Sequence, residues 1–303
     1  MPNWVTNNFI IHAKGDTLND ILKSIQGEND VLGSFDFNKV IPMPDSLNVT
    51  DGSITMEAIE AFLSHLKNEA QKQDVRSIPS DDFLKYWSTA ETIGKKSFFR
   101  EPMKFLSDKE ISSRAEKHIM TPSDFVGLGK TYLDNQIQYG AHTWYYWRIE
   151  NWGTKWPAEK GSLLQGENIL SFETAWSAPI PVIAKLSEKF PKVSFFLDWA
   201  DEDIGQNVGS CGFLAGEAVD LYLPNPGSKE AYDLAFSIRG ISPADCFLRY
   251  DEAQNEYVYD KDLENAYYEA FTPGKAALDD VIQSATERTE SEDKATIPAE
   301  IER

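Results

Sequence analysis

The sequence predicts an α+β fold, because two distant stretches each read strand, helix, strand, and a long helical stretch lies between them. The first stretch covers residues 9–41 and the second covers residues 169–199. Two such units in one chain are typical of a ferredoxin-like split βαβ sheet, with helices packed on one face.

The first unit opens with a short strand at residues 9–12, where side chains alternate between two faces. A helix is predicted next, because apolar residues recur at i, i+3, i+4 and i+7 between Leu18 and Ile25. Thr17 and Asp20 resemble a capping box at its start. Residues 35–41 then read as the second strand, which ends at a pair of prolines.

The second unit has strands at residues 169–176 and 193–199. Pro179 and Pro181 between them suit the first turn of a helix, whose apolar face continues to Phe190. We therefore expect a second strand, helix and strand to complete the sheet.

The residues between the two units are predicted to be helical from about 53 to 139. One amphipathic helix is indicated between Ile54 and Leu66, and others at 81–92, 108–119 and 123–139. We expect this insertion at the junction of the two halves, where extra chain leaves the order of the strands unchanged.

These patterns predict a division of the chain into four parts. After the second unit comes a strand around Val219, then a helix around Ala235 and a hairpin at residues 247–259. Beyond about Thr286 the chain is charged and nearly free of aromatic residues, which is typical of a disordered tail. The expected parts are a ferredoxin-like domain at 1–227 with a helical insertion at about 53–142, a C-terminal α/β extension at 228–285, and a disordered tail at 286–303.

The composition limits the classes of partner. The formal charge is −20, from 49 acidic and 29 basic residues. Direct nucleic-acid binding is disfavoured, because Lys and Arg contacts to phosphates supply most of the non-specific affinity for nucleic acids. Phe195 and Phe196 invite comparison with RNA-recognition sheets, but strand alternation places them on opposite faces. We instead expect a protein partner, and the sequence gives neither the identity of that partner nor the oligomeric state of this chain.

The cysteine content and the N-terminal sequence favour a cytoplasmic protein. Cys211 and Cys246 are the only cysteines, and the N-terminus lacks both a basic stretch and a long apolar run. No stretch approaches the eighteen apolar residues of a membrane span, so we expect no membrane association.

The most unusual stretch is Trp144–Trp156, which holds four of the eight tryptophans. Aromatic rings next to basic and amide side chains either lock a core together or present a recognition surface. We favour packing where the insertion meets the sheet, and a binding role remains open beside it. The candidate binding residues are Trp144, Trp147, Arg148, Asn151, Trp152, Lys155 and Trp156.

No other group of residues predicts a catalytic site, a metal site or a cofactor. The acidic residues between Asp198 and Asp220 do not follow the spacing of a calcium loop, so we interpret them as solvated. The four histidines and two cysteines lack the spacing of zinc ligands.

Four phrases of the sequence resemble the Api92-like or YubB-like ferredoxin-like domain. In chain order they are residues 1–7 (MPNWVTN), 37–44 (FNKVIPMP), 147–156 (WRIENWGTKW) and 172–179 (FETAWSAP). The resemblance implies a ferredoxin-like fold and an origin on phages, plasmids and genomic islands of bacteria. It implies no catalytic residues. The family often has Cys where this chain has Val5.

The leading functional hypothesis is therefore a non-enzymatic accessory protein of a mobile element that acts by binding another protein. Its acidic surface suits a basic partner, for instance a host nucleic-acid-binding or defence protein that it inhibits by charge mimicry. The alternative is an enzyme or small-ligand module that binds a nucleotide or acidic metabolite at the insertion/sheet junction. In that alternative, Arg148 and Lys155 bind the anion.

Overall fold

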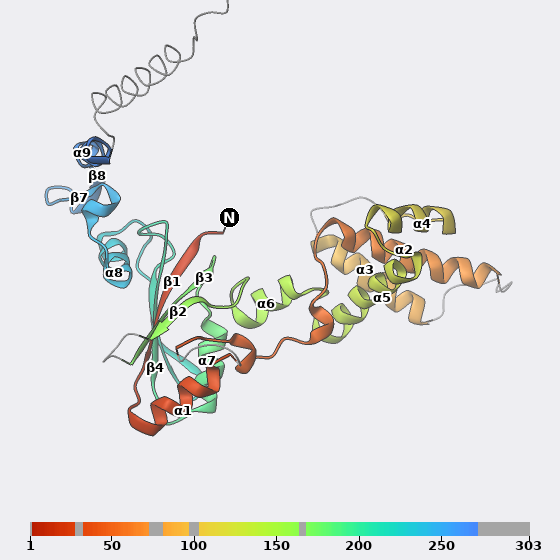
Figure 1. Ribbon diagram of the computed structural model, residues 1–303, viewed down its shortest axis with the longest axis horizontal. Helices are drawn as coiled ribbons and strands as arrows, with labels where there is room; N and C mark the ends of the chain where they lie inside the picture. The colour runs from red at the N-terminus through yellow and green to blue at the C-terminus, as the bar shows by residue number, and fades with distance from the viewer. Residues whose placement is uncertain (1, 28–32, 73–80, 97–102, 164–167, 272–303) are drawn as a thin grey trace, which may run out of the picture.

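The computed structural model describes residues 2–27, 33–72, 81–96, 103–163 and 168–271 (Figure 1). The expected α+β class is confirmed. The elements of the main sheet and the helices that pack on it are β1 (Trp4–Ile11), α1 (Gly15–Ile25), β2 (Glu159–Leu163), β3 (Ile169–Ala175), α7 (Ile180–Lys189), β4 (Phe195–Asp201), β5 (Gly209–Leu214), β6 (Glu217–Tyr222) and α8 (Lys229–Arg239).

In the described part of the chain, the main sheet has six strands in the order β2-β3-β1-β4-β5-β6, all antiparallel. The first four strands follow the order of a split βαβ sheet. Along β1, Val5, Asn7, Phe9 and Ile11 are buried, while the residues that alternate with them are half-buried. Period-two alternation therefore directs one face of the sheet to the core, where α1 and α7 contribute Ile21 and Leu186.

The predicted strand at residues 35–41 is wrong. Phe37–Lys39 form a short 3₁₀ helix, which begins where the Asp36 side chain accepts a hydrogen bond from the Asn38 N–H. Phe35 and Phe37 are both buried against the ring of Phe172. Their two-residue spacing therefore reflects insertion of both rings into the core, and not pairing in the sheet.

The strand that fills the predicted place in the sheet is β2, which pairs with β3 and begins more than a hundred residues later in the chain. As a result the helical segment lies inside the first strand–helix–strand unit, between α1 and β2, and not between two complete halves. The predicted capping box is also absent: α1 begins at Gly15, and Thr17 lies inside the helix.

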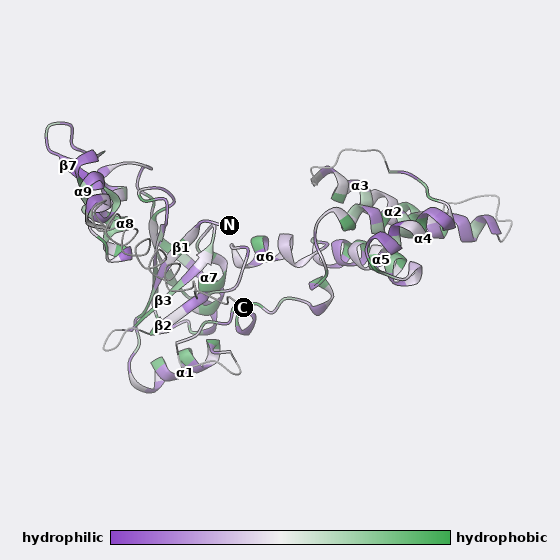
Figure 2. Cartoon of the chain, turned by 45° about the horizontal axis from the view of Figure 1, so that its top comes forward, coloured by the Kyte–Doolittle hydropathy of each residue, from purple (hydrophilic) through white to green (hydrophobic). Residues whose placement is uncertain are grey.

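The helices between α1 and β2 form a separate group with its own core. They are α2 (Ser53–Lys72), α3 (Asp81–Lys96), α4 (Asp108–Lys117) and α5 (Pro122–Tyr139), followed by α6 (Trp144–Trp152). Figure 1 shows α2 to α5 at one end of the molecule, the sheet at the other, and α6 between them. Polar and apolar residues alternate along α2, α3 and α5 in Figure 2, as expected for helices with one buried face.

The tryptophans of α6 belong to the core of the sheet and not to the core of the helical group. Trp152 is completely buried, and its ring meets Phe37 and Trp147 edge-to-face at 5.7 and 5.8 Å between centroids. Its indole Nε1–H donates to the carbonyl oxygen of Ile41 at 2.9 Å. Trp152 thus joins the end of α6 to the segment that leaves the sheet after α1.

The opposite face of the sheet is partly covered by α8. Asn8 of β1 donates to the Ile238 carbonyl at 3.0 Å, and Arg239 donates to the Thr6 hydroxyl at 3.1 Å. A hairpin of β7 (Leu248–Asp251) and β8 (Glu256–Tyr259) follows, as predicted, and then α9 (Lys261–Phe271). The predicted tail at residues 286–303 lies outside the described residues.

We predict opposite effects for two glycines of α5. A Cβ added at Gly129 meets the Ala58 carbonyl oxygen of α2 at 2.0 Å, whereas one at Gly127 meets nothing within 4 Å. Gly129→Ala should therefore lower the free energy of unfolding by about 1–3 kcal/mol through overpacking. Gly127→Ala should raise it by up to about 1 kcal/mol through helix propensity. Urea denaturation of both variants measures the difference, and equal effects would contradict a close α2–α5 crossing.

We also predict that Trp152→Ala lowers the free energy of unfolding by about 3–5 kcal/mol, because it empties a core site and leaves the Ile41 carbonyl without its donor. Ile149→Ala is the matched control on the same helix, because its side chain is 42% exposed. The control should change stability by less than about 0.5 kcal/mol. Chemical denaturation followed by circular dichroism tests both. A small effect of Trp152→Ala would show that α6 is not anchored by this ring.

Candidate functional site

The candidate binding residues lie on α6 and on the turn that follows it. The helix ends at Gly153, which has φ +78° and caps it in the left-handed conformation. A Cβ at this position would lie 2.7 Å from Cδ of Pro181 in α7. Glycine is therefore required both by the backbone conformation and by the close approach of α7.

A chain of buried and half-buried polar groups fixes this turn to the sheet. Thr154 donates through its hydroxyl to the Ala175 carbonyl at 2.7 Å, and the Ser177 hydroxyl donates to the Gly153 carbonyl. The Thr174 hydroxyl accepts from the buried amide of Asn7 at 2.8 Å. The phrases of the sequence around residues 150 and 175 therefore meet in space.

The structure divides the predicted residues into two groups. Trp147 and Trp152 are 6% and 0% exposed, so a partner cannot reach their rings. Asn151 donates through its side chain to the Trp147 carbonyl at 2.9 Å, which makes it part of the helix end. Trp144, Arg148, Lys155 and Trp156 are half-buried and keep part of their surface in solvent.

These four residues and Tyr145 form what we call the aromatic–cation surface. The Arg148 guanidinium carbon lies 5.0 Å from the centre of the Trp144 ring and 4.9 Å from that of Trp152. The Lys155 amine lies 5.4 Å from the Tyr145 ring and 4.9 Å from the Trp156 ring. Such positions over ring faces favour a cation electrostatically.

The aromatic–cation surface continues onto the sheet through Trp4 of β1, whose ring lies 5.8 Å from that of Trp156. Here the next cation has an acidic partner, because Lys160 is 2.7 Å from the Glu173 carboxylate. Lys160 therefore differs from Arg148 and Lys155, because its charge is paired with a carboxylate.

The sheet has an exposed apolar edge that the sequence pattern does not reveal. The alternating pattern around Val219 predicts an ordinary strand, yet all six residues of β6 are exposed. Leu221 and Leu223 are each 60% exposed. Alternation alone could not show this, because it does not tell a central strand from an edge strand.

The acidic, histidine and cysteine side chains do not form a metal site in the described part of the chain. Within the described residues, no three His, Cys, Asp or Glu side chains gather where they could hold a metal ion. Asp201 is buried and accepts hydrogen bonds from Asn3, Asn207 and the Asp203 N–H. Its role is thus to fix the end of β4.

Of the residues described, no helix combines the length and apolar character that spanning a bilayer requires.

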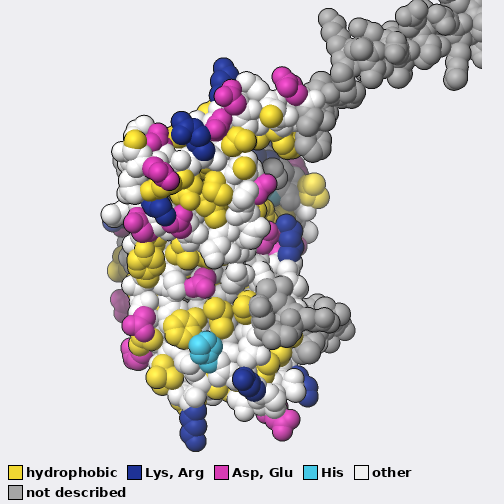
Figure 3. All heavy atoms as spheres, turned by 90° about the vertical axis from the view of Figure 1, so that its left-hand side faces the viewer, with side chains coloured by type: hydrophobic (Ala, Val, Ile, Leu, Met, Phe, Trp, Pro, Cys, Tyr) yellow, Lys and Arg dark blue, Asp and Glu magenta, His cyan; other side chains and the backbone are white. Residues whose placement is uncertain are grey.

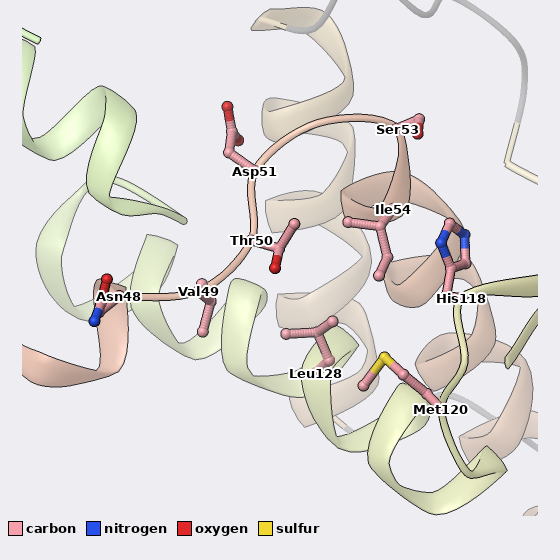
Figure 4. Close-up of a pocket in the computed structure, with 9 residues that line it drawn as sticks. All are labelled: Asn48, Val49, Thr50, Asp51, Ser53, Ile54, His118, Met120 and Leu128. Atoms are coloured by element: carbon pink, nitrogen blue, oxygen red, sulfur yellow. The ribbon is translucent and has the colours of Figure 1, made fainter.

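A cavity of about 620 Å³ lies in the helical group, where the chain enters α2. Figure 4 shows the side chains of Ile54, Met120 and Leu128 directed toward one another, with Asp51 pointing away from them. His118 lies at one side of the cavity, and its Nε2 is 3.1 Å from the Glu57 carboxylate. Glu57 also forms an ion pair with Lys117 at 2.8 Å. The cavity is lined by Asn48, Val49, Thr50, Asp51, Ser53, Ile54, His118, Met120 and Leu128.

These contacts predict a pH-dependent contribution to stability. Burial alone would raise the pKa of Glu57, but hydrogen bonds from Lys117 and His118 outweigh it and hold the pKa below its ordinary value near 4.5. The ionised carboxylate therefore stabilises the fold above that value, and this contribution is lost as the pH falls through the lowered pKa. Glu57→Gln should cost on the order of 1 kcal/mol at pH 7, and the difference from wild type should shrink below about pH 4.5.

Glu116→Gln is the control for this measurement, because Glu116 is exposed on the same α4 helix as Lys117. Urea denaturation across the pH range gives the two curves. A stability difference for Glu57→Gln that did not change with pH would contradict the assigned ion pair.

Comparison with known proteins gives a family match for one part of the chain. Residues 151–242 match the family model described as a ferredoxin-like domain in Api92-like protein. This range runs from the end of α6 through β2 to β6 and α8.

A search of solved structures found the crystal structure of a protein api92 from Yersinia pseudotuberculosis. It is 12% identical, with a TM-score of 0.34, and the match covers 75% of this chain and 100% of the other. The search of curated proteins found no match. The resemblance expected from the sequence is thus confirmed over residues 151–242, which are similar to the ferredoxin-like domain in Api92-like protein.

Proposed function

We propose that this protein acts by binding another protein, and that it does so at the outer edge of its sheet. The observation that carries the proposal is the exposed apolar character of β6 and Leu223. In keeping with the implied mobile-element origin of the family, we propose a cytoplasmic accessory role for a phage or plasmid.

The two edges of the sheet differ. At β2, the backbone of Gly33 lies against Gly161. A Cβ added at Gly161 would be 3.0 Å from the carbonyl oxygen of Gly33. At β6, Val219, Leu221 and Tyr222 are 40–60% exposed. An edge strand offers unpaired N–H and C=O groups, to which an extended segment of another protein can add as a further strand.

The edge is held rigidly for such an encounter. Ala215 and Gly216 have positive φ values of 53° and 93°, which form a tight two-residue turn between β5 and β6. The Gly216 N–H donates to the Ser187 hydroxyl of α7 at 2.9 Å. A partner would therefore meet a preformed strand, which lowers the entropy lost on binding.

The charges on β6 favour a basic partner over a second copy of the chain. Glu217 and Asp220 lie on the strand, and Asp220 has φ +52° where the pairing with β5 shifts register. Two copies would place like charges together, on chains that each carry −20. A strand that carries Lys or Arg would instead be attracted to Glu217 and Asp220. A host nucleic-acid-binding or defence protein is a partner of this kind.

Figure 3 shows the side of the molecule that carries α8 and the C-terminal hairpin. Hydrophobic side chains are exposed there in groups, with acidic and basic side chains scattered between them. The acidic excess forms no single patch on this face. The grouped apolar side chains on this face support binding by apolar contact, assisted by charge.

The test is affinity capture from bacterial host lysate with the full chain, quantified by mass spectrometry. Replacing both Leu221 and Leu223 with Lys removes apolar contact and adds charge that a basic partner repels. Recovery of the partner should fall at least about tenfold, which corresponds to about 1.4 kcal/mol.

Leu84→Lys is the matched control, because Leu84 is 50% exposed on α3 in the helical group. It should leave recovery unchanged. Equal recovery with the edge variant and the control, or no protein recovered with wild type, would overturn the proposal.

A further inference from the structure

The aromatic–cation surface contains two cations without an acidic partner. In the part of the chain that the structure describes, neither Arg148 nor Lys155 forms an ion pair with a carboxylate. Carboxylates are in excess in this chain, which has 49 acidic residues and 29 basic ones. Lys160 is close by and is paired with Glu173 at 2.7 Å, so acidic partners are available in this region.

The Arg148 side chain has an unsatisfied hydrogen-bond donor. Its Nε atom is buried and has no hydrogen-bond partner. Burial also lowers the pKa of the guanidinium. A buried donor without an acceptor is destabilising, and so is a partly desolvated charge without a counter-charge. An anion at this position would relieve the unpaired charge.

The rings provide a second element of recognition. Trp144, Arg148 and Trp152 are four residues apart and follow one another along one side of α6. Tyr145 meets Trp144 edge-to-face at 5.7 Å, so the two cations flank a pair of half-buried rings. The packing of Trp147 and Trp152 in the core holds this arrangement in place before any ligand arrives.

The combination of partly exposed rings and unpaired cations points to a ligand that is both planar and anionic. We propose that the aromatic–cation surface, formed by Trp144, Tyr145, Arg148, Lys155 and Trp156, binds a small aromatic anion such as a nucleoside monophosphate. The phosphate contacts Arg148 and Lys155, and the base packs against the rings.

The net charge limits the size of the ligand. A charge of −20 repels a long polyanion over many phosphates, while a single phosphate requires only a local cationic site. This site lies on α6 and its turn, whereas the proposed protein-binding edge lies on β6. The two proposals therefore rest on different residues and can fail independently.

The test uses the full chain with three probes: adenosine monophosphate, adenosine and inorganic phosphate. Quenching of tryptophan fluorescence and isothermal titration calorimetry report binding. We expect the monophosphate to bind more tightly than either adenosine or phosphate alone. Arg148→Met and Lys155→Met should each weaken its binding at least about tenfold, as loss of a charge-assisted contact does.

Lys85→Met is the control, because Lys85 is exposed on α3 and lies outside this surface. It should bind the monophosphate like wild type. Lys155→Met serves as the second variant if Arg148→Met does not fold, which circular dichroism would show. Failure of wild type to bind the monophosphate would overturn the proposal, as would equal binding by all variants or equal affinity for adenosine. Tighter binding of a single-stranded oligonucleotide than of the monophosphate would overturn the restriction to a small ligand.

Discussion

The hydrogen bond and packing of Trp152 are the constraint on which the arrangement of this molecule depends. The helical group has a core of its own, so it would have no fixed position without a link to the sheet. Trp152 provides the link, because its ring lies in the core of the sheet and its indole holds the Ile41 carbonyl. The chain that leaves the sheet and the helix that returns to it are thereby held at one point.

A second set of contacts fixes the same two segments at the helical group. The Asn135 amide of α5 donates to the Ser46 carbonyl at 2.8 Å, and the Tyr132 hydroxyl donates to the Thr50 carbonyl. Thr143, just before α6, donates to Asp51 at 3.1 Å. Burial raises the pKa of Tyr132 to about 12, so its hydroxyl stays protonated and can donate throughout the physiological range. The outgoing and returning segments are therefore tied together at both ends.

The sequence predicts elements well where local pattern and burial agree. β3, α5 and α7 have clear periodicity and fall within a few residues of their predicted bounds. β2 carries the sequence Glu-Lys-Gly-Ser-Leu, which has no strand signal, and it is a strand because β3 pairs with it. The pattern does not predict the start of β1, because Asn7 is polar yet buried, and a strand face with a buried amide does not read as apolar.

The candidate site was predicted in part for a related reason. The density of aromatic residues marked α6, but aromatic residues on every side of a helix conceal which side is buried. Only the fold separates Trp147 and Trp152, which hold the helix, from Trp144 and Trp156, which remain accessible. The β6 edge could not be predicted, because the exposure of a strand depends on its place in the sheet.

The position of the helical group between α1 and β2 has a consequence for how the chain folds. Before β2 can join the sheet, the chain must close a loop that contains the whole group. The entropy of loop closure rises with the number of disordered residues between the ends. A helical group that folds first, through contacts within the group such as those of α2 with α5, brings its two ends together and shortens the effective loop. We therefore expect the insertion to gain protection before the sheet does, an order that pulse-labelled hydrogen exchange during refolding would reveal or refute.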